Sequence, residues 1–364
     1  MINKLVLENL KHRPVRTLLS VLAIAIEVTM ILTLVGLSRG MLDEAGRRAK
    51  GVGADVWIRP PGSSAISFSS APMSEGLLKY FGEQPHVTVA TGTIAQPIGG
   101  IDTVTGVDLE KFSRLSGGFR YLAGGPFQAP DDILVDERYA KQNHLEVGSQ
   151  LKLLNKQWRV CGIFETGKLA RLVLPLARLQ ELTGNTGKLT QIFVKLDDPK
   201  LTNEMVRSFK QKLPDYAIYS IEEFTSLFSV NNVPGLKPFI YVVIAISVIV
   251  GFLVVFLSMY TAVLERTREI GILKSLGAGP NYILSILLRE TFVLAAVGSL
   301  MGILFSFGTR WLILEFAGAT LTAMITPDWW PTTTIIAVGG AVMGSLYPGW
   351  KAIKQDALEA LSYE

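Results

Sequence analysis

The sequence predicts a membrane protein with four transmembrane α-helices and a large α+β extracytoplasmic domain between helices 1 and 2. Three observations predict this fold. Residues 239–263 contain no Asp, Glu, Lys or Arg, and a helix of that length measures about 37 Å, enough to cross a bilayer with tilt. Residues 40–236 are polar enough to fold in water and long enough for one or two cores. Lys and Arg residues flank the apolar runs in a pattern that sets their orientation.

The basic flanks predict that both termini face the cytoplasm in a multi-pass protein of the cell inner (plasma) membrane. Basic residues also follow the first span, but they precede a long domain, where this rule is weak. The predicted segments are, in order, an interfacial helix (1–16), span one (17–39), a periplasmic α+β domain (40–236), span two (237–264), a cytoplasmic helix (265–279), span three (280–309), a periplasmic loop (310–331), span four (332–350) and a cytoplasmic tail (351–364).

Within the periplasmic domain, alternating apolar residues predict strands and a change to a four-residue period predicts helices. The strands are expected at 54–58, 86–94, 101–107, 150–154, 157–164, 171–174, 191–196 and 217–219, and the helices at 201–213 and 221–228. A β-rich subdomain is expected at about 126–198. It is inserted into a discontinuous subdomain made of 44–125 and 199–232.

Several kinds of chemistry lack support in the sequence. There is no Gly-x-x-x-x-Gly-Lys-Ser/Thr motif for phosphate binding, and none of the three histidines has a metal-ligand partner at the usual spacing. We find no catalytic serine context and no basic stripe with interleaved aromatic residues for nucleic acid. Cys161 is the single cysteine and is expected on a buried strand. The chain is therefore predicted to be neither an enzyme nor a nucleic-acid-binding protein, with no metal site and no cofactor of its own.

The segment 265–279 is unusually elaborate for a turn between two spans. Its acidic residues near the start and a lysine near the end suit the dipole of a short helix, and a glycine-rich stretch ends it. Ile270, Leu273, Lys274 and Gly277 are expected to share one face, flanked by Ile272 and Leu276. An ordinary turn is the alternative, but an apolar stripe bordered by charge fits a groove on a partner protein.

Three stretches resemble the FtsX-like permease family of ABC transporters, of the MacB, LolC, LolE and DevC type. The first is the run Glu265-Arg266-x-x-Glu269-Ile270-Gly271-x-Leu273-Lys274-x-Leu276-Gly277-Ala278. The second is Asn9-Leu10-x-x-Arg13-Pro14-x-Arg16-Thr17-Leu18-Leu19-Ser20. The third is the tail from Pro348 to Leu361, in which Asp356-Ala357 stands where the family usually has Asp-Pro. The order of one span, a large external domain and three further spans is also similar.

The resemblance implies a permease subunit that couples ATP hydrolysis to motion of its periplasmic domain, for efflux or extraction of a drug, lipid or lipoprotein. A separate ABC ATPase, which carries ATP and magnesium, is expected to bind the coupling segment through Glu265, Arg266, Arg268, Glu269, Ile270, Gly271, Leu273, Lys274 and Gly277. Further expected partners are a second permease copy and membrane lipid; a periplasmic adaptor and an outer-membrane channel stay open. The alternative is an FtsX-like, non-transporting signal transmitter that activates a periplasmic cell-wall hydrolase.

Glu27 is a charged residue near the middle of span one. A charge at that depth costs about 3 kcal/mol or more, so Glu27 is expected to face protein or water. A structural hydrogen bond to a Ser or Thr of span two and a functional role in a substrate cavity or at a dimer contact remain equally open.

Two small-residue stripes in spans three and four allow close contact between helices. They are Gly298-x-x-x-Gly302 and Gly340-x-x-x-Gly344. Packing inside the four-helix bundle is the simpler interpretation, and a contact between two permease copies is the alternative.

Overall fold

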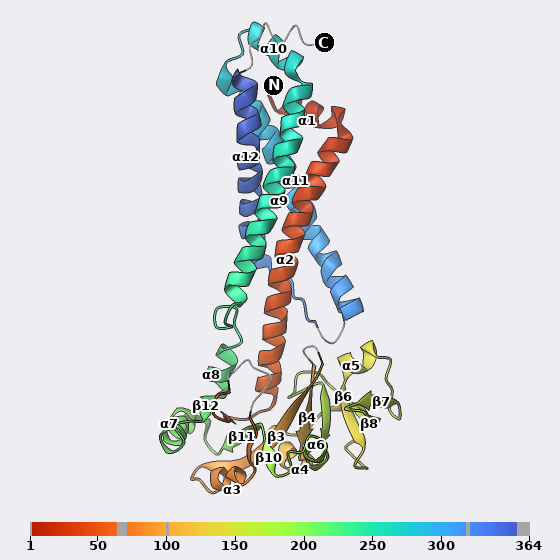
Figure 1. Cartoon of the computed structure of the whole chain (residues 1–364), viewed down its shortest axis with the longest axis vertical. Coiled ribbons are helices and arrows are strands. Elements are labelled where there is room, and N and C mark those ends of the chain that lie inside the picture. The colour runs from red at the N-terminus through yellow and green to blue at the C-terminus, as the bar shows by residue number, and fades with distance from the viewer. Residues whose placement is uncertain (1, 64–70, 100–101, 318–320, 355–364) are drawn as a thin grey trace. The chain divides into compact units, whose positions relative to one another are not determined.

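The computed structural model describes residues 2–63, 71–99, 102–317 and 321–354 (Figure 1). The chain divides into two compact units. The helical unit comprises residues 1–38, 235–313 and 323–364, and the α/β unit comprises residues 39–234 and 314–322.

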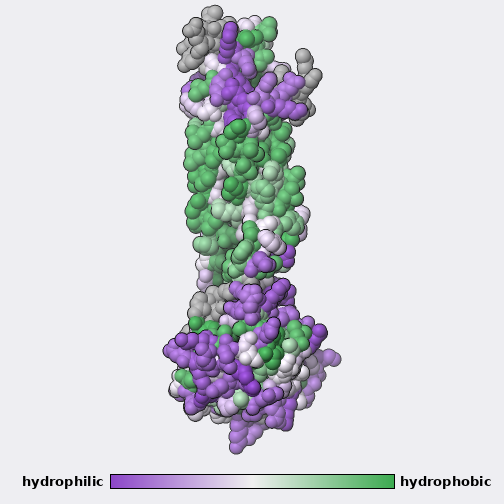
Figure 2. All heavy atoms as spheres, turned by 90° about the vertical axis from the view of Figure 1, so that its right-hand side faces the viewer, coloured by the Kyte–Doolittle hydropathy of each residue, from purple (hydrophilic) through white to green (hydrophobic). Residues whose placement is uncertain are grey.

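The helical unit consists of long apolar helices joined by short connections. They are α1 (Ile2–His12), α2 (Pro14–Gly51), α9 (Leu236–Glu265), α10 (Thr267–Ser275), α11 (Pro280–Leu312), η3 (Pro327–Trp329) and α12 (Trp330–Lys354). The short helix η2 (Ile313–Ala317) follows α11, and all of it except Ile313 belongs to the α/β unit. Within the described residues, three helices are long and apolar enough to cross a membrane, at Pro14–Gly51, Leu236–Glu265 and Pro280–Ala317. On the face drawn in Figure 2, this unit has a hydrophobic band and a hydrophilic end where α10 lies.

The predicted fourth span lies within α12, which packs against α9 and α11. This helix is not among the three candidates. Of the predicted cytoplasmic tail, residues 351–354 continue α12, and residues 355–364 lie outside the described residues.

The first long helix does not end at residue 39, where the sequence placed the end of span one. Helix α2 continues without a break to Gly51, so its residues 39–51 belong to the α/β unit. The predicted end of span one followed the loss of hydropathy and marks the expected edge of the membrane, and the helix itself continues beyond it. A helix needs a break in its backbone hydrogen bonding to stop, and polar side chains do not supply one.

The α/β unit is built on one mixed sheet of ten strands (Figure 1). Its strand order is β12-β1-β11-β3-β4-β9-β6-β8-β5, with β7 paired to β8, and β2 and β10 form a separate pair. The strands are β1 (Val56–Arg59), β2 (Met73–Ser74), β3 (Val87–Gly99), β4 (Asp102–Val107), β5 (Tyr121–Gly124), β6 (Asp132–Asp136), β7 (Gln150–Leu153), β8 (Lys156–Phe164), β9 (Leu172–Pro175), β10 (Lys188–Leu189), β11 (Gln191–Leu196) and β12 (Ala217–Ser220). The helices are α3 (Leu77–Gly82), α4 (Leu109–Ser116), α5 (Glu137–Gln142), α6 (Leu176–Leu182), η1 (Pro199–Leu201), α7 (Thr202–Lys212) and α8 (Ile221–Ser226).

The strands predicted from alternation and the two predicted helices are present at close to the expected positions. Cys161 is buried on β8, as predicted. The predicted boundary between subdomains is wrong, because β11 lies between β1 and β3. Val194 pairs with Val56 on one side and with Ala90 on the other. The two predicted parts therefore share one sheet.

Short helices of this unit begin at side-chain caps that the sequence analysis overlooked. Asp108 accepts hydrogen bonds from the backbone of Glu110 and Lys111 at the start of α4, and Ser220 accepts one from Glu223 at the start of α8. Each cap satisfies a backbone N–H group that has no partner within the helix.

Candidate functional site

Residues 265–279, which we call the coupling segment, fold as a short helix between two backbone breaks. Helix α9 ends at Glu265, and Arg266 leaves helical geometry before α10 begins at Thr267. After α10, Gly277 adopts a φ of +91°, and the backbone N–H of Ala278 returns to the carbonyl of Leu273 at 2.9 Å. A glycine ends a helix in this way because a left-handed residue has no steric cost without Cβ. The segment is thus a separate helix and not a bent extension of α9 or α11.

The inner face of α10 is buried within the helical unit. Ile270 is 7% exposed and belongs to a cluster with Val263, Ile283, Leu287 and Ala352. Gly271 is buried as well. The residues predicted to form one docking face therefore do not share one environment, because Ile270 is part of the core of the helical unit.

Half-buried positions lie at the side of α10. Leu273 and Lys274 are both partly exposed, and the Lys274 Nζ donates to the carbonyl of Ile353 at 2.6 Å. This bond joins α10 to the end of α12, so Lys274 has a structural contact within the chain.

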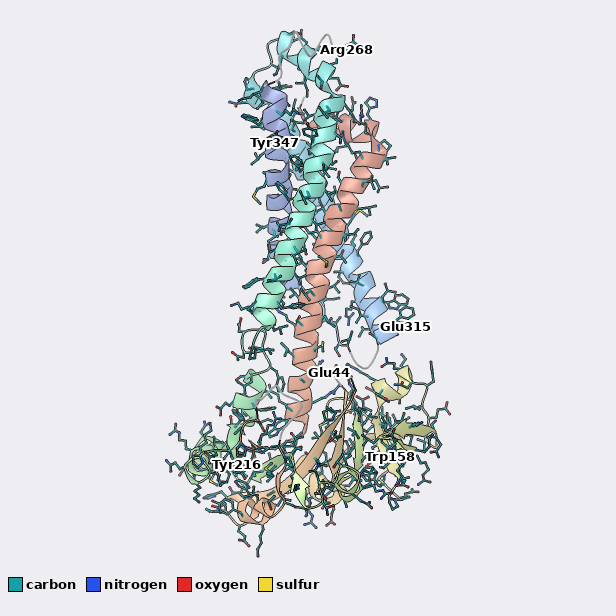
Figure 3. The ribbon with its side chains drawn as sticks, viewed as in Figure 1. Glu44, Trp158, Tyr216, Arg268, Glu315 and Tyr347 are labelled. Atoms are coloured by element: carbon teal, nitrogen blue, oxygen red, sulfur yellow. The ribbon has the colours of Figure 1, made fainter. Side chains whose placement is uncertain are left out.

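The outer face of α10 carries exposed apolar side chains among charges. Leu276 is 80% exposed and Ile272 is 44% exposed, and Arg268 and Glu269 are exposed beside them. Figure 3 places Arg268 at the outer end of this unit. We call Arg268, Glu269, Ile272 and Leu276 the outer face. Sequence reasoning placed Ile272 and Leu276 only at the edge of the docking stripe, since periodicity cannot tell which apolar side meets the chain's own core.

A buried charge cluster lies at the base of α10. The Glu290 carboxylate on α11 is fully buried, and it lies 3.2 Å from the Nη2 of Arg16 and 3.1 Å from the Nη1 of Arg266. Arg266 also donates to the backbone carbonyl of Asn9 at 3.1 Å. Arg266 is 8% exposed, and its contacts connect it to α1 and α11, so it does not belong to the outer face. Sequence reasoning missed Glu290, although its charge at the start of an otherwise uncharged run was a signal.

At the edge of this cluster, Glu265 pairs with Arg13 and lies 3.6 Å from Arg16. Its side chain is 43% exposed. Charges of opposite sign therefore alternate from Arg13 through Glu265, Arg16 and Glu290 to Arg266. We call Arg16, Glu290 and Arg266 the Arg–Glu–Arg triad.

Glu27 lies in the contact between α2 and α9. It is 6% exposed, and a Cβ at Gly251 would lie 1.9 Å from its Oε2. Its Oε1 has no hydrogen-bond partner in the described part of the chain. Two turns away, the hydroxyls of Ser20 and Ser258 are hydrogen-bonded at 2.6 Å. The position of α9 that faces Glu27 is thus a glycine, which leaves room for the carboxyl group.

The predicted small-residue stripes face helices of the same chain. A Cβ at Gly302 would lie 2.7 Å from the carbonyl oxygen of Ala25, and one at Gly298 would lie 2.7 Å from Ile24. Gly344 approaches the carbonyl of Phe252 on α9. Gly340 has more space, with its nearest neighbour at 3.5 Å. These glycines let α11 approach α2 and let α12 approach α9.

The α/β unit contains a second charge cluster that sequence reasoning missed. The Glu44 carboxylate, 6% exposed, pairs with Arg48 one turn along α2, with Arg138 at 3.0 Å and with Arg171 at 3.2 Å. It also accepts a hydrogen bond from the Thr322 hydroxyl. Glu44, labelled in Figure 3, thus joins the end of α2 to Arg138 on α5, to Arg171 next to β9 and to Thr322, all within this unit.

Asp136 lies beside this cluster and caps helix α5. It is 1% exposed and accepts a hydrogen bond from the backbone of Tyr139 at 2.8 Å. Burial raises the pKa of Asp136 to about 6, against the opposing effect of that hydrogen bond and of Arg48 and Arg171. Burial has this effect because it penalises the charged carboxylate.

Among the described residues, no group of three or more His, Cys, Asp or Glu side chains is placed to hold a metal ion. The observed features are an exposed amphipathic face on α10, the triad at its base, and an α/β unit held by its own ion pairs.

The two parts of the chain each match a known family. Residues 17–212, more than half of the 364 residues, match the family described as MacB-like periplasmic core domain, and residues 241–357 match the one described as FtsX-like permease C-terminal. The chain belongs to the FtsX-like permease family. It is an ABC transporter permease of the MacB-like type.

Two relatives and one solved structure illustrate the similarity. The permease is 25% identical to the macrolide export ATP-binding/permease protein MacB of Nitrobacter winogradskyi, over 96% of this chain and 58% of the relative. It is 35% identical over 159 residues to an uncharacterized ABC transporter permease, YknZ of Bacillus subtilis, which covers 41% of this chain and 37% of the relative. The crystal structure of the periplasmic region of MacB from Actinobacillus actinomycetemcomitans aligns with a TM-score of 0.38 at 15% identity, over 51% of this chain and 97% of that one. The permease thus spans less than two thirds of the length of either relative.

Proposed function

We propose that this chain is the permease subunit of an ATP-driven, mechanotransmission-type ABC transporter. A separate ABC ATPase binds the outer face of α10, and ATP-driven motion passes through the helices to the α/β unit. That unit acts in the periplasm for efflux or extraction of an amphipathic substrate such as a drug, a lipid or a lipoprotein. The observation that carries the proposal is an exposed apolar face on a helix whose opposite face is fixed to the chain's own core.

The charge pattern supports the position of this helix in the cytoplasm. Arg13, Arg16, Arg266 and Arg268 gather at the end of the helical unit that contains α10. Basic residues collect on the cytoplasmic side of spanning helices. We therefore place the chain in the inner membrane with four spans, both termini in the cytoplasm and the α/β unit outside.

The partner supplies the chemistry that the permease lacks. The 364 residues contain no phosphate-binding Gly-x-x-x-x-Gly-Lys-Ser/Thr motif. ATP and magnesium belong to the ATPase. Two permeases are expected in each complex, because ABC ATPases of this family work as pairs. The large external domain favours a transporter over a signal transmitter that activates a cell-wall hydrolase.

The test is capture of the ATPase by the full chain. A tagged chain is solubilised from its native membranes and recovered, and the bound proteins are identified by mass spectrometry and assayed for ATP hydrolysis. We expect an ABC ATPase, and we expect Leu276→Asp to lose it, because a carboxylate on the outer face must be dehydrated on binding.

Leu122→Asp is the matched control, since Leu122 is 48% exposed on β5 of the α/β unit. It is expected to retain the ATPase. Undiminished capture by Leu276→Asp would show that the outer face is not the docking site. Capture of a cell-wall hydrolase without ATP-dependent transport would favour the signal transmitter.

A further inference from the structure

Glu27 places a carboxyl group inside the helical bundle, in the contact between α2 and α9 (Figure 1). The side chain is 6% exposed, and its Oε2 lies where a Cβ at Gly251 would meet it at 1.9 Å. Its Oε1 has no hydrogen-bond partner in the part of the chain that the structure describes. The carboxyl group is therefore packed directly against the backbone of α9.

The sequence supplies no counter-ion at the depth of Glu27. Four runs of the predicted spans contain no Lys, Arg or His, and Glu27 is their single acidic residue; they are 17–38, 239–263, 291–309 and 332–350. The charged residues that bound these runs are Arg16 and Arg39 on α2, Lys237 and Glu265 on α9, Glu290 and Arg310 on α11, and Asp328 and Lys351 at the two ends of α12. Along α2 the nearest charges lie about 16 and 18 Å from Glu27, and along α9 about 21 Å from Gly251, at 1.5 Å per residue. A second copy of the chain would bring the same uncharged runs.

Tyrosines are the other titratable groups in these runs. Tyr241 and Tyr347 are more than half exposed on the outside of the bundle. The hydroxyl of Tyr260 accepts a hydrogen bond from the Lys351 Nζ at 2.7 Å. Along α9, Tyr241 and Tyr260 lie about 15 and 14 Å from Gly251. None of them therefore reaches Glu27 in this arrangement.

A carboxyl group in these surroundings is stable only in its neutral form. A buried charge without a counter-ion is so costly that the group binds a proton instead. The close fit against Gly251 leaves little space for the water that an ionised carboxylate needs. Ionisation of Glu27 therefore requires water to enter between α2 and α9, and the two helices must move apart to admit it.

We propose that Glu27 is a proton-binding site that controls the contact between α2 and α9. With the proton bound, the carboxyl group packs against Gly251 as in this structure. On release, the O–H bond of the acid breaks, its electron pair stays on the carboxylate, and the proton passes to water as hydronium. The carboxylate is then hydrated and the helices separate at this level. The proposal rests on the membrane location of the proposed function and not on its ATPase, so failure to capture an ATPase would not affect it.

The first measurement asks whether Glu27 carries a proton. The purified full chain in lipid vesicles is studied by infrared spectroscopy, in which a protonated carboxylic acid has a C=O stretching band that a carboxylate lacks. At neutral pH we expect such a band to be lost in Glu27→Gln. Glu110→Gln is the control, because Glu110 is exposed and paired with Arg114, and it is expected to keep the band. Identical spectra of Glu27→Gln and the unaltered chain would overturn the proposal.

The second measurement asks whether the proton controls the helix contact. Nitroxide labels are attached at Ile26→Cys and Val250→Cys, which replace exposed residues next to the contact, after Cys161→Ser removes the single native cysteine. Electron paramagnetic resonance then reports how far apart the labels lie. We expect them to be closest at low pH and to separate as pH rises. The ratio of packed to separated molecules should fall by at most about tenfold per pH unit, as the release of one proton requires.

Three variants of the labelled chain complete the design. Glu27→Gln replaces the acid by a neutral amide of similar size and should stay packed at every pH. Gly251→Ala should be separated at every pH, because its Cβ would overlap the carboxyl group. Ser20→Ala is the matched control: it removes a hydroxyl that bonds Ser258 in the same contact, and it should keep the pH response. Equal pH responses of Glu27→Gln and the unaltered chain, or a label separation in the unaltered chain that does not change with pH, would overturn the proposal.

Discussion

Replacing Glu290 by glutamine tests whether the Arg–Glu–Arg triad holds the base of α10 together. The change keeps the size of the side chain and removes its charge. The two guanidinium groups, whose side chains are 17% and 9% exposed, then face a neutral amide. They stay largely dehydrated, and they repel each other without an anion between them.

The magnitude follows from the distances. Opposite charges about 4 Å apart attract by about 4 kcal/mol at an effective dielectric constant of about 20. Two such pairs offset the cost of dehydrating three ions, which is several kcal/mol each. Loss of the shared carboxylate removes both attractions and restores little hydration, so we expect a destabilisation of about 3–5 kcal/mol.

The assay is thermal unfolding of the purified chain in detergent. At about 2–4 °C per kcal/mol, the midpoint of Glu290→Gln should fall by about 6–20 °C. Glu110→Gln is the control, because it breaks an exposed pair with Arg114 on α4 and should shift the midpoint very little. The triple variant Arg16→Met, Glu290→Leu and Arg266→Met removes all three charges and should recover most of the loss. A Glu290→Gln midpoint equal to that of Glu110→Gln would refute the reasoning.

Two further predictions concern other parts of the chain. Asp136→Asn keeps a capping acceptor but does not titrate. In the unaltered chain the pKa of Asp136 is raised from 3.8 to about 6. Its contribution to the free energy of unfolding, roughly 3 kcal/mol, is therefore complete below about pH 4 and is lost as pH rises through about 6. Unfolding midpoints between pH 4 and pH 7.5 should therefore fall less steeply for Asp136→Asn, and equal slopes would contradict the shift. Gly302→Ala should destabilise the helical unit by about 1–3 kcal/mol, because its Cβ would meet the backbone of α2. In Gly340→Ala the nearest neighbour of the new Cβ lies at 3.5 Å, so its unfolding midpoint should be close to that of the unaltered chain. Equal losses of stability in the two variants would show that the close approach of the helices is not the cause.

Local sequence patterns were sufficient to predict the elements but not their pairing. Short apolar runs located β1, β3 and β11 along the chain. The position of β11 between β1 and β3 depends on contacts such as that of Val194 with Val56. These residues are far apart in the sequence, so no short stretch of sequence contains the pair. Hydropathy likewise did not predict that α2 continues past residue 39, the predicted end of span one, because it reports a change of solvent and helix geometry can continue through that change.

The candidate site was located from sequence, while the role of each residue within it was not. Charge and periodicity marked 265–279 as a helix with an apolar stripe. Ile270 and Leu276 are both apolar, and only the positions of α11 and α12 determine that Ile270 is buried and Leu276 exposed. Likewise, the burial of Arg266 depends on Glu290, a residue of another helix.

The contacts of α10 bear directly on how force applied at its outer face would travel. A helix that could rotate in place would absorb such a force without moving its neighbours. Three contacts prevent this rotation: Arg266 is tied to Glu290 and to the backbone of Asn9, Ile270 is packed in the core, and Lys274 is bonded to the carbonyl of Ile353. They lie at the start, middle and end of the segment, and they join it to α11, α1 and α12. We therefore expect a displacement imposed at Leu276 to move several helices of the unit together, as the proposed mechanical coupling requires.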